Sequence, residues 1–163
     1  MNSLHPVPPD LSCVPACLVA ITGLRPGVVE SLMSRYRDDG WVTYDDTGRV
    51  SLACGETMIP AILIDLGYRI AESETRKPVR EWAALSRRVG RPFVLLATDA
   101  QDRNHAMIVA DGLAFDNIAF GLPAAQHPFA DAISDQAFQW KNPTYASRGK
   151  ALDRLKRDTR RTP

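Results

Sequence analysis

The chain has 163 residues and a mass of 18.0 kDa, and 45% of its residues are hydrophobic, which suits one globular domain of ordinary size. Its formal net charge is only +1, so the overall field gives no reason to expect a nucleic-acid partner. No stretch approaches the roughly 20 apolar residues of a membrane span, and residues 5–10 break the apolar run that a signal peptide needs. We therefore expect a cytoplasmic protein with no membrane partner.

Two segments are predicted from composition. Residues 1–145 form one continuous domain without repeats, and residues 146–163 form a basic tail. From Arg148 onward, seven Lys or Arg oppose two Asp, a net charge of +5, which is typical of a solvated helix with a frayed end. The three cysteines are expected to be free thiols, because their number is odd and a cytoplasmic compartment is reducing.

The first half of the chain predicts helices. One begins at Cys13 with Ser12 as its N-cap, and it ends at Gly23; its run 17–21 is nearly all apolar, which indicates a buried helix. A second helix is predicted from Pro26 to about residue 38, and residues 41–53 as a loop or short hairpin. A third helix over 56–66 precedes a strand at 68–71, and a fourth helix follows Pro78 and stops at Gly90.

The second half predicts strands. Residues 93–97 are an unbroken apolar run, which suits a central strand buried on both faces. After a polar turn at 99–104, the runs 105–110 and 113–116 flank Asp111-Gly112, a dipeptide that fits a two-residue hairpin turn. Helices followed by an antiparallel sheet predict an α+β domain.

Three side chains are candidates for chemistry. Cys13 lies at a helix start, where free N–H groups and the helix dipole favour a thiolate, whereas Cys17 lies one turn later and is expected in the core. The hairpin turn brings Asp116, at the end of the return strand, near His105 at the start of the first strand, where it could fix the imidazole tautomer. On spacing alone, a surface histidine and a surface aspartate fit the pattern equally well.

These residues carry a resemblance to a known family. Residues 12–18, Ser-Cys-Val-Pro-Ala-Cys-Leu, resemble the Cys-Gly-Pro-Ala-Cys-Leu signature of the papain-like peptidases that process double-glycine leader peptides. Residues 91–96, 104–109 and 115–117 are similar to that family's buried strand, histidine strand and aspartate-bearing strand, and residues 55–68 resemble its helix ending in Gly-Tyr. The resemblance covers roughly residues 10–120, in the family's order.

The resemblance implies a papain-like fold, with an N-terminal catalytic helix packed against the C-terminal sheet, and a peptidase acting on a peptide or protein. Cys13 is then the nucleophile, His105 its base and Asp116 the orienting residue, with no cofactor and no metal. Asn117 competes with Asp116 for the orienting role, since papain itself uses an asparagine there.

The chain departs from the family at two positions. The family usually has a glutamine shortly before the cysteine as an oxyanion donor, and no Gln precedes Cys13; Asn2, His5 or a backbone amide could replace it. Val14 stands where the family has glycine.

Three alternative functions remain open from the sequence. One is a zinc site built from Cys13, Cys17, Cys54 and His105. Another is a scaffold that keeps the papain-like fold but serves as a protein-interaction module. The third is a deamidase or transglutaminase-like enzyme with the same triad.

Overall fold

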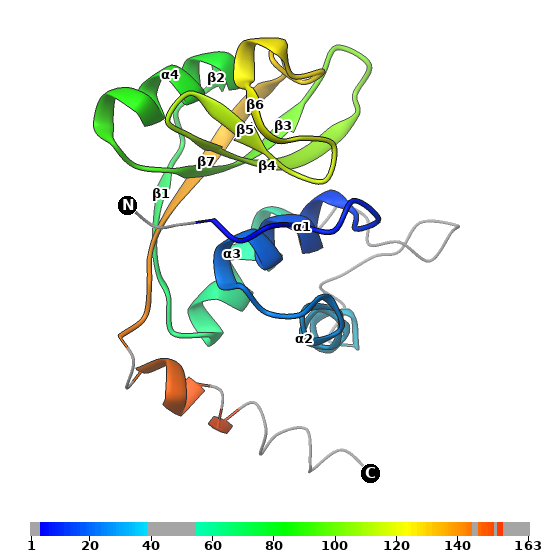
Figure 1. Ribbon diagram of the computed structural model, residues 1–163, viewed down its shortest axis with the longest axis vertical. Helices are drawn as coiled ribbons and strands as arrows, with labels where there is room; N and C mark the ends of the chain where they lie inside the picture. The colour runs from blue at the N-terminus through cyan, green and yellow to red at the C-terminus, as the bar shows by residue number, and fades with distance from the viewer. Residues whose placement is uncertain (1–3, 39–54, 145–146, 152, 155–163) are drawn as a thin grey trace.

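The computed structural model describes residues 4–38, 55–144, 147–151 and 153–154, and it contains a group of helices and an antiparallel sheet (Figure 1). The helices are α1 (Cys13–Thr22), α2 (Pro26–Asp38), α3 (Gly55–Asp65) and α4 (Val79–Val89), with a short 3-10 helix η2 (Ala124–Gln126). The strands are β1 (Arg69–Ser73), β2 (Lys77–Pro78), β3 (Phe93–Thr98), β4 (Asn104–Ala110), β5 (Leu113–Phe115), β6 (Phe120–Pro123) and β7 (Ile133–Lys141).

The sheet has seven strands in the order β1-β7-β3-β4-β5-β6, and β2 pairs with β7. Every pairing is antiparallel. β3 lies between β7 and β4 and five of its six residues are buried, which agrees with the central position predicted from its apolar run. The Asp111-Gly112 turn joins β4 to β5 with φ angles of 50° and 80°, as a two-residue hairpin requires.

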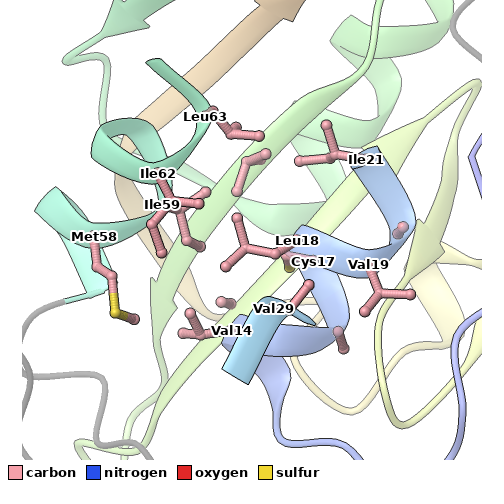
Figure 2. Packing of buried hydrophobic residues seen from close by; sticks show 14 of the residues in the cluster. Val14, Cys17, Leu18, Val19, Ile21, Val29, Met58, Ile59, Ile62 and Leu63 are labelled. Atoms are coloured by element: carbon pink, nitrogen blue, oxygen red, sulfur yellow. The ribbon is translucent and has the colours of Figure 1, made fainter. Parts of the chain in front are cut away.

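Two hydrophobic clusters lie on opposite faces of the sheet, because successive side chains of a strand point to opposite sides. The first contains Val94 and Leu96 of β3 with residues of α1, α2 and α3; Figure 2 shows Leu18, Ile21 and Ile62 in it. The second contains Phe93 and Leu95 of β3 with residues of α4. The fold is therefore an α+β domain with α1 packed against the sheet, as predicted.

Helix α1 is buried along nearly its whole length, from Val14 to Thr22. It ends at Gly23, whose φ of 66° is the left-handed conformation that glycine adopts easily and whose N–H bonds to the carbonyl of Val19. Within the described residues, no single helix has the length and apolar composition of a membrane span; α1 and α2 pass that test only as a pair bent by 119°.

Most element boundaries agree with the sequence prediction to within two residues. The prediction stopped at Asp116 and assigned no element to residues 117–145, where the structure has β6, η2 and β7. The expected loop at 41–53 lies outside the described residues. At the start of the tail, residues 147–151 are helical. Arg148, which is exposed, donates a hydrogen bond of 3.1 Å to the carbonyl of Thr22, at the C-terminal end of α1.

Candidate active site

Cys13 is the first residue of α1 and its side chain is half-buried. Ser12 occupies the N-cap position, but its side chain makes no capping hydrogen bond. The first backbone bond of the helix runs from the N–H of Ala16 to the carbonyl of Ser12, at 3.0 Å. The N–H of Cys13 precedes that bond and has no partner inside the helix, so the thiol lies beside a backbone donor at the positive end of a helix dipole.

His105 lies near the start of β4 and Asp116 directly after β5, and the hairpin brings their side chains together. Nε2 of His105 is 2.6 Å from Oδ2 of Asp116, and both side chains are buried. The Cys13 side chain lies close enough to His105 to affect its pKa. Since Nε2 faces the carboxylate, Nδ1 is the ring nitrogen left for the thiol.

The electrostatics of this group favour a charged imidazole. Burial alone would lower the pKa of His105, but the hydrogen bond with Asp116 and the interactions with Cys13 outweigh burial and raise that pKa to about 9. Burial would raise the pKa of Asp116, but hydrogen bonds from His105 and the Ala119 N–H, together with the close contact of His127, hold that pKa well below its usual range. Asp116 is therefore an anion that stabilises the imidazolium.

The second oxygen of Asp116 is fixed by the backbone. Oδ1 accepts the N–H groups of Ile118 at 2.8 Å and Ala119 at 2.7 Å. These bonds close the turn between β5 and β6 around the carboxylate. The carboxylate plane is therefore held, which leaves Oδ2 directed at the histidine.

A further histidine, which the sequence prediction missed, lies on the same oxygen. His127 follows η2 and is buried, and its Nε2 is 2.9 Å from Oδ2 of Asp116. The contact has the length of a hydrogen bond, although Nε2 makes no well-aligned hydrogen bond within the described part of the chain. The only sequence signal was the residue type, since the chain has three histidines and nothing in the local pattern links residue 127 to residue 116.

An aromatic ring covers the imidazole. Phe129 stacks on His105 with ring centroids 4.5 Å apart and an angle of 19° between the planes. The guanidinium of Arg103 lies over the Phe129 ring, 5.7 Å from its centroid, and forms a salt bridge of 2.6 Å with Asp99. Phe129 thereby shields the His105 imidazole from water.

The structure separates the alternatives that the sequence left open. Asp116 contacts His105, whereas the buried side-chain oxygen of Asn117 has no hydrogen-bond partner among the described residues. The expectation that His5 could serve as an oxyanion donor is wrong, because its ring packs over Gly23 at the far end of α1, about 15 Å of helix from Cys13. Asn2, the other side chain named for that role, lies outside the described residues.

The alternative zinc site would need Cys17 as one of its four ligands. Cys17 is fully buried among the apolar residues of the first cluster, and burial raises its pKa well above the ordinary value, with the charges of Cys13 and Asp116 adding to the effect. Cys54 lies outside the described residues.

Another donor set of metal-ligand type is present in His105, Asp116 and His127. Its N–O distances of 2.6 and 2.9 Å are those of hydrogen bonds, and adjacent ligands about 2.0 Å from a zinc ion in tetrahedral geometry would be farther apart. The arrangement therefore fits a hydrogen-bonded group better than a metal centre.

A surface hollow of about 460 Å³ lies at the opposite end of the sheet, where β3 begins. Arg69, Arg91 and Lys141 give it a basic lining beside Trp140. None of its lining residues is a cysteine or histidine, so it lacks the nucleophile and base that the Cys13 group brings together.

The fold is similar to that of a solved peptidase domain. The chain is similar to the peptidase domain of Streptococcus ComA, a bifunctional ABC transporter involved in a quorum sensing pathway. The two share 14% identity, with a TM-score of 0.52, over 88% of this chain and 100% of that domain. No protein-family model and no curated protein matches the chain. The predicted papain-like α+β fold is therefore confirmed, and any role for single residues has to come from this chain's own geometry.

Proposed function

We propose that the protein is a cysteine peptidase that cleaves an amide bond of a peptide or protein. The observation that carries the proposal is the buried contact of 2.6 Å between His105 and the Asp116 carboxylate, together with a Cys13 thiol close enough to raise the pKa of His105. A nucleophile, a base and an orienting acid in this order are what thiol-based acyl transfer needs.

The reaction would begin with transfer of the Cys13 proton to Nδ1 of His105, which gives a thiolate and an imidazolium. Asp116 stabilises that imidazolium, as the raised pKa of His105 indicates. The thiolate attacks the carbonyl carbon and the C=O electron pair moves to oxygen. When the tetrahedral intermediate collapses, the C–N bond breaks and His105 gives its proton to the leaving amine. Water, with His105 again as base, then hydrolyses the thioester to an acid and restores the thiol.

The start of α1 would stabilise the oxyanion. The backbone N–H of Cys13 has no partner inside the helix, and the helix dipole adds partial positive charge at this end. Since no glutamine stands before Cys13, the second donor has to come from another group. Removal of one such donor typically costs about 2.7 to 4 kcal/mol of activation free energy, so its identity affects the rate strongly.

Alkylation with iodoacetamide at pH 6 to 9, followed by peptide mass spectrometry, tests the proposal. Cys17 is an internal control, because it is a buried thiol with a raised pKa in the same protein. We expect Cys13 to react at least about 100-fold faster than Cys17 near neutral pH, and His105→Ala to slow Cys13 alone. If both thiols react equally slowly, and His105→Ala does not change their rates, the peptidase proposal fails and the protein-interaction module is supported instead.

A cleavage assay separates a peptidase from other acyl-transfer enzymes. A mixed peptide pool is incubated with the unmodified protein and with Cys13→Ala, and the products are compared by mass spectrometry. New N-termini that require Cys13 support a peptidase. A mass gain of about one dalton at glutamine side chains would indicate a deamidase.

A further inference from the structure

His127 makes two contacts that fix which of its ring nitrogens carries the proton. The backbone N–H of Phe129 donates to Nδ1 of His127 at 3.1 Å. Nδ1 is therefore an acceptor without a hydrogen, and a neutral imidazole must then carry its proton on Nε2. That nitrogen lies 2.9 Å from Oδ2 of Asp116, with its side chain fully buried.

One carboxylate oxygen thus faces two imidazoles. Oδ2 of Asp116 lies 2.6 Å from Nε2 of His105 and 2.9 Å from Nε2 of His127, while Oδ1 is occupied by two backbone N–H groups. A buried anion needs such partners, because each unmet acceptor position costs free energy. Among the described residues, His127 is the one side chain besides His105 whose contact with Asp116 has the length of a hydrogen bond.

We propose that His127 is a positioning residue of the active site, a neutral histidine that holds Oδ2 of Asp116 in place for His105. The inference rests on the proposed function and adds a fourth side chain to it. His127 does not meet the thiol or the substrate carbonyl in this assignment. It acts through Asp116, and by keeping that carboxylate ionised and immobile it keeps the His105 imidazole directed at Cys13.

The same histidine also places the ring that covers His105. The bond from the Phe129 N–H to Nδ1 of His127 closes a two-residue turn, and Phe129 then stacks on His105 at 4.5 Å. Segment 127–129 therefore affects the His105 imidazole in two ways: His127 contacts its partner Asp116, and Phe129 stacks on its ring. The other charged group on this side, Arg103, lies beyond Phe129 and is paired with Asp99.

Two conservative variants separate the two contacts of His127. Gln at this position offers an amide N–H near the Nε2 site, so His127→Gln keeps a donor for Asp116 and loses the acceptor for Phe129. Asn offers an oxygen near the Nδ1 site, so His127→Asn keeps the acceptor and loses the donor. We expect His127→Asn to slow the alkylation of Cys13 about tenfold or more at pH 6 to 7 and to alter its pH profile, and His127→Gln, which keeps the donor for Asp116, to slow it less than His127→Asn does.

The outcomes distinguish this inference from the proposed function. If His105→Ala slows alkylation while His127→Asn behaves like the unmodified protein, the positioning role is wrong and the peptidase proposal stands. If His105→Ala has no effect, the peptidase proposal itself fails. Ring-nitrogen NMR of the unmodified protein needs no variant to fold: a proton on Nε2 of His127 at pH 7 supports the assignment, and a proton on Nδ1 overturns it.

Discussion

Replacement of Asp116 by asparagine tests the electrostatics of the site most directly. The amide oxygen of Asn would accept the N–H groups of Ile118 and Ala119 as Oδ1 does now, so its NH₂ group would face both histidines. Nε2 of His105 would then have to accept a hydrogen bond, which moves its proton to Nδ1, the nitrogen that faces the thiol. In that tautomer the imidazole cannot take the proton of Cys13.

The size of the effect follows from the pKa of His105. That pKa rises from 6.5 to about 9, which at about 1.36 kcal/mol per unit corresponds to at most about 3 kcal/mol in favour of the imidazolium. Asp116 provides part of this stabilisation and Cys13 the rest. We therefore expect Asp116→Asn to remove about 1.5 to 3 kcal/mol, a loss of about 10- to 150-fold in alkylation of Cys13 at pH 6 to 7.

The assay is iodoacetamide alkylation of Cys13 from pH 5 to 10. Asp111→Asn is the matched control, because it makes the same change in the same hairpin on an exposed side chain whose contact with Arg87 is a surface ion pair. Circular dichroism shows whether each variant is folded. An Asp116→Asn protein that is folded and has the pH profile of the unmodified protein would refute the reasoning.

Three further outcomes are expected. The pKa of His105 is raised on folding, so its contribution to stability is complete below about pH 6.5 and is lost as the pH rises to about 9; urea unfolding should show a fall of up to about 3 kcal/mol that His105→Gln lacks. Cys17→Ser places a hydroxyl in the apolar core and should lower the unfolding free energy by about 1 to 3 kcal/mol, with the alkylation profile of Cys13 retained. Gly112→Ala imposes a φ of 80° on a residue with a side chain and should cost about 1 to 2 kcal/mol in urea, again without effect on Cys13.

Short-range patterns explain why much of the fold could be predicted. The buried helix α1 follows from its continuous apolar run, and the hairpin of β4 and β5 follows from Asp111-Gly112 between two apolar stretches. These signals involve residues that are neighbours in sequence. They also brought His105 and Asp116 close enough for their contact to be expected.

Long-range pairing was harder to predict. β7 lies between β1 and β3, yet its sequence Ile-Ser-Asp-Gln-Ala-Phe-Gln-Trp-Lys has polar residues at several positions and no continuous apolar run. Its pairing with β3 also contains a register shift between Leu96 and Ala97, and the local sequence pattern does not predict such a shift. His127 was missed for the same reason, because only tertiary contacts bring it to Asp116.

The thiol and the imidazole draw their support from different hydrophobic cores. Cys13 packs against the cluster that contains residues of α1, α2 and α3, whereas Phe129, the ring stacked on His105, belongs to the cluster that contains residues of α4, and the two clusters share no residue. The distance between the Cys13 sulfur and the His105 ring therefore depends on how these two clusters are placed relative to each other. A substitution that loosens the packing of either cluster would change the distance between the thiol and the imidazole before the protein unfolds. Substitutions far from the site, in either core, therefore offer a means of changing the reactivity of Cys13.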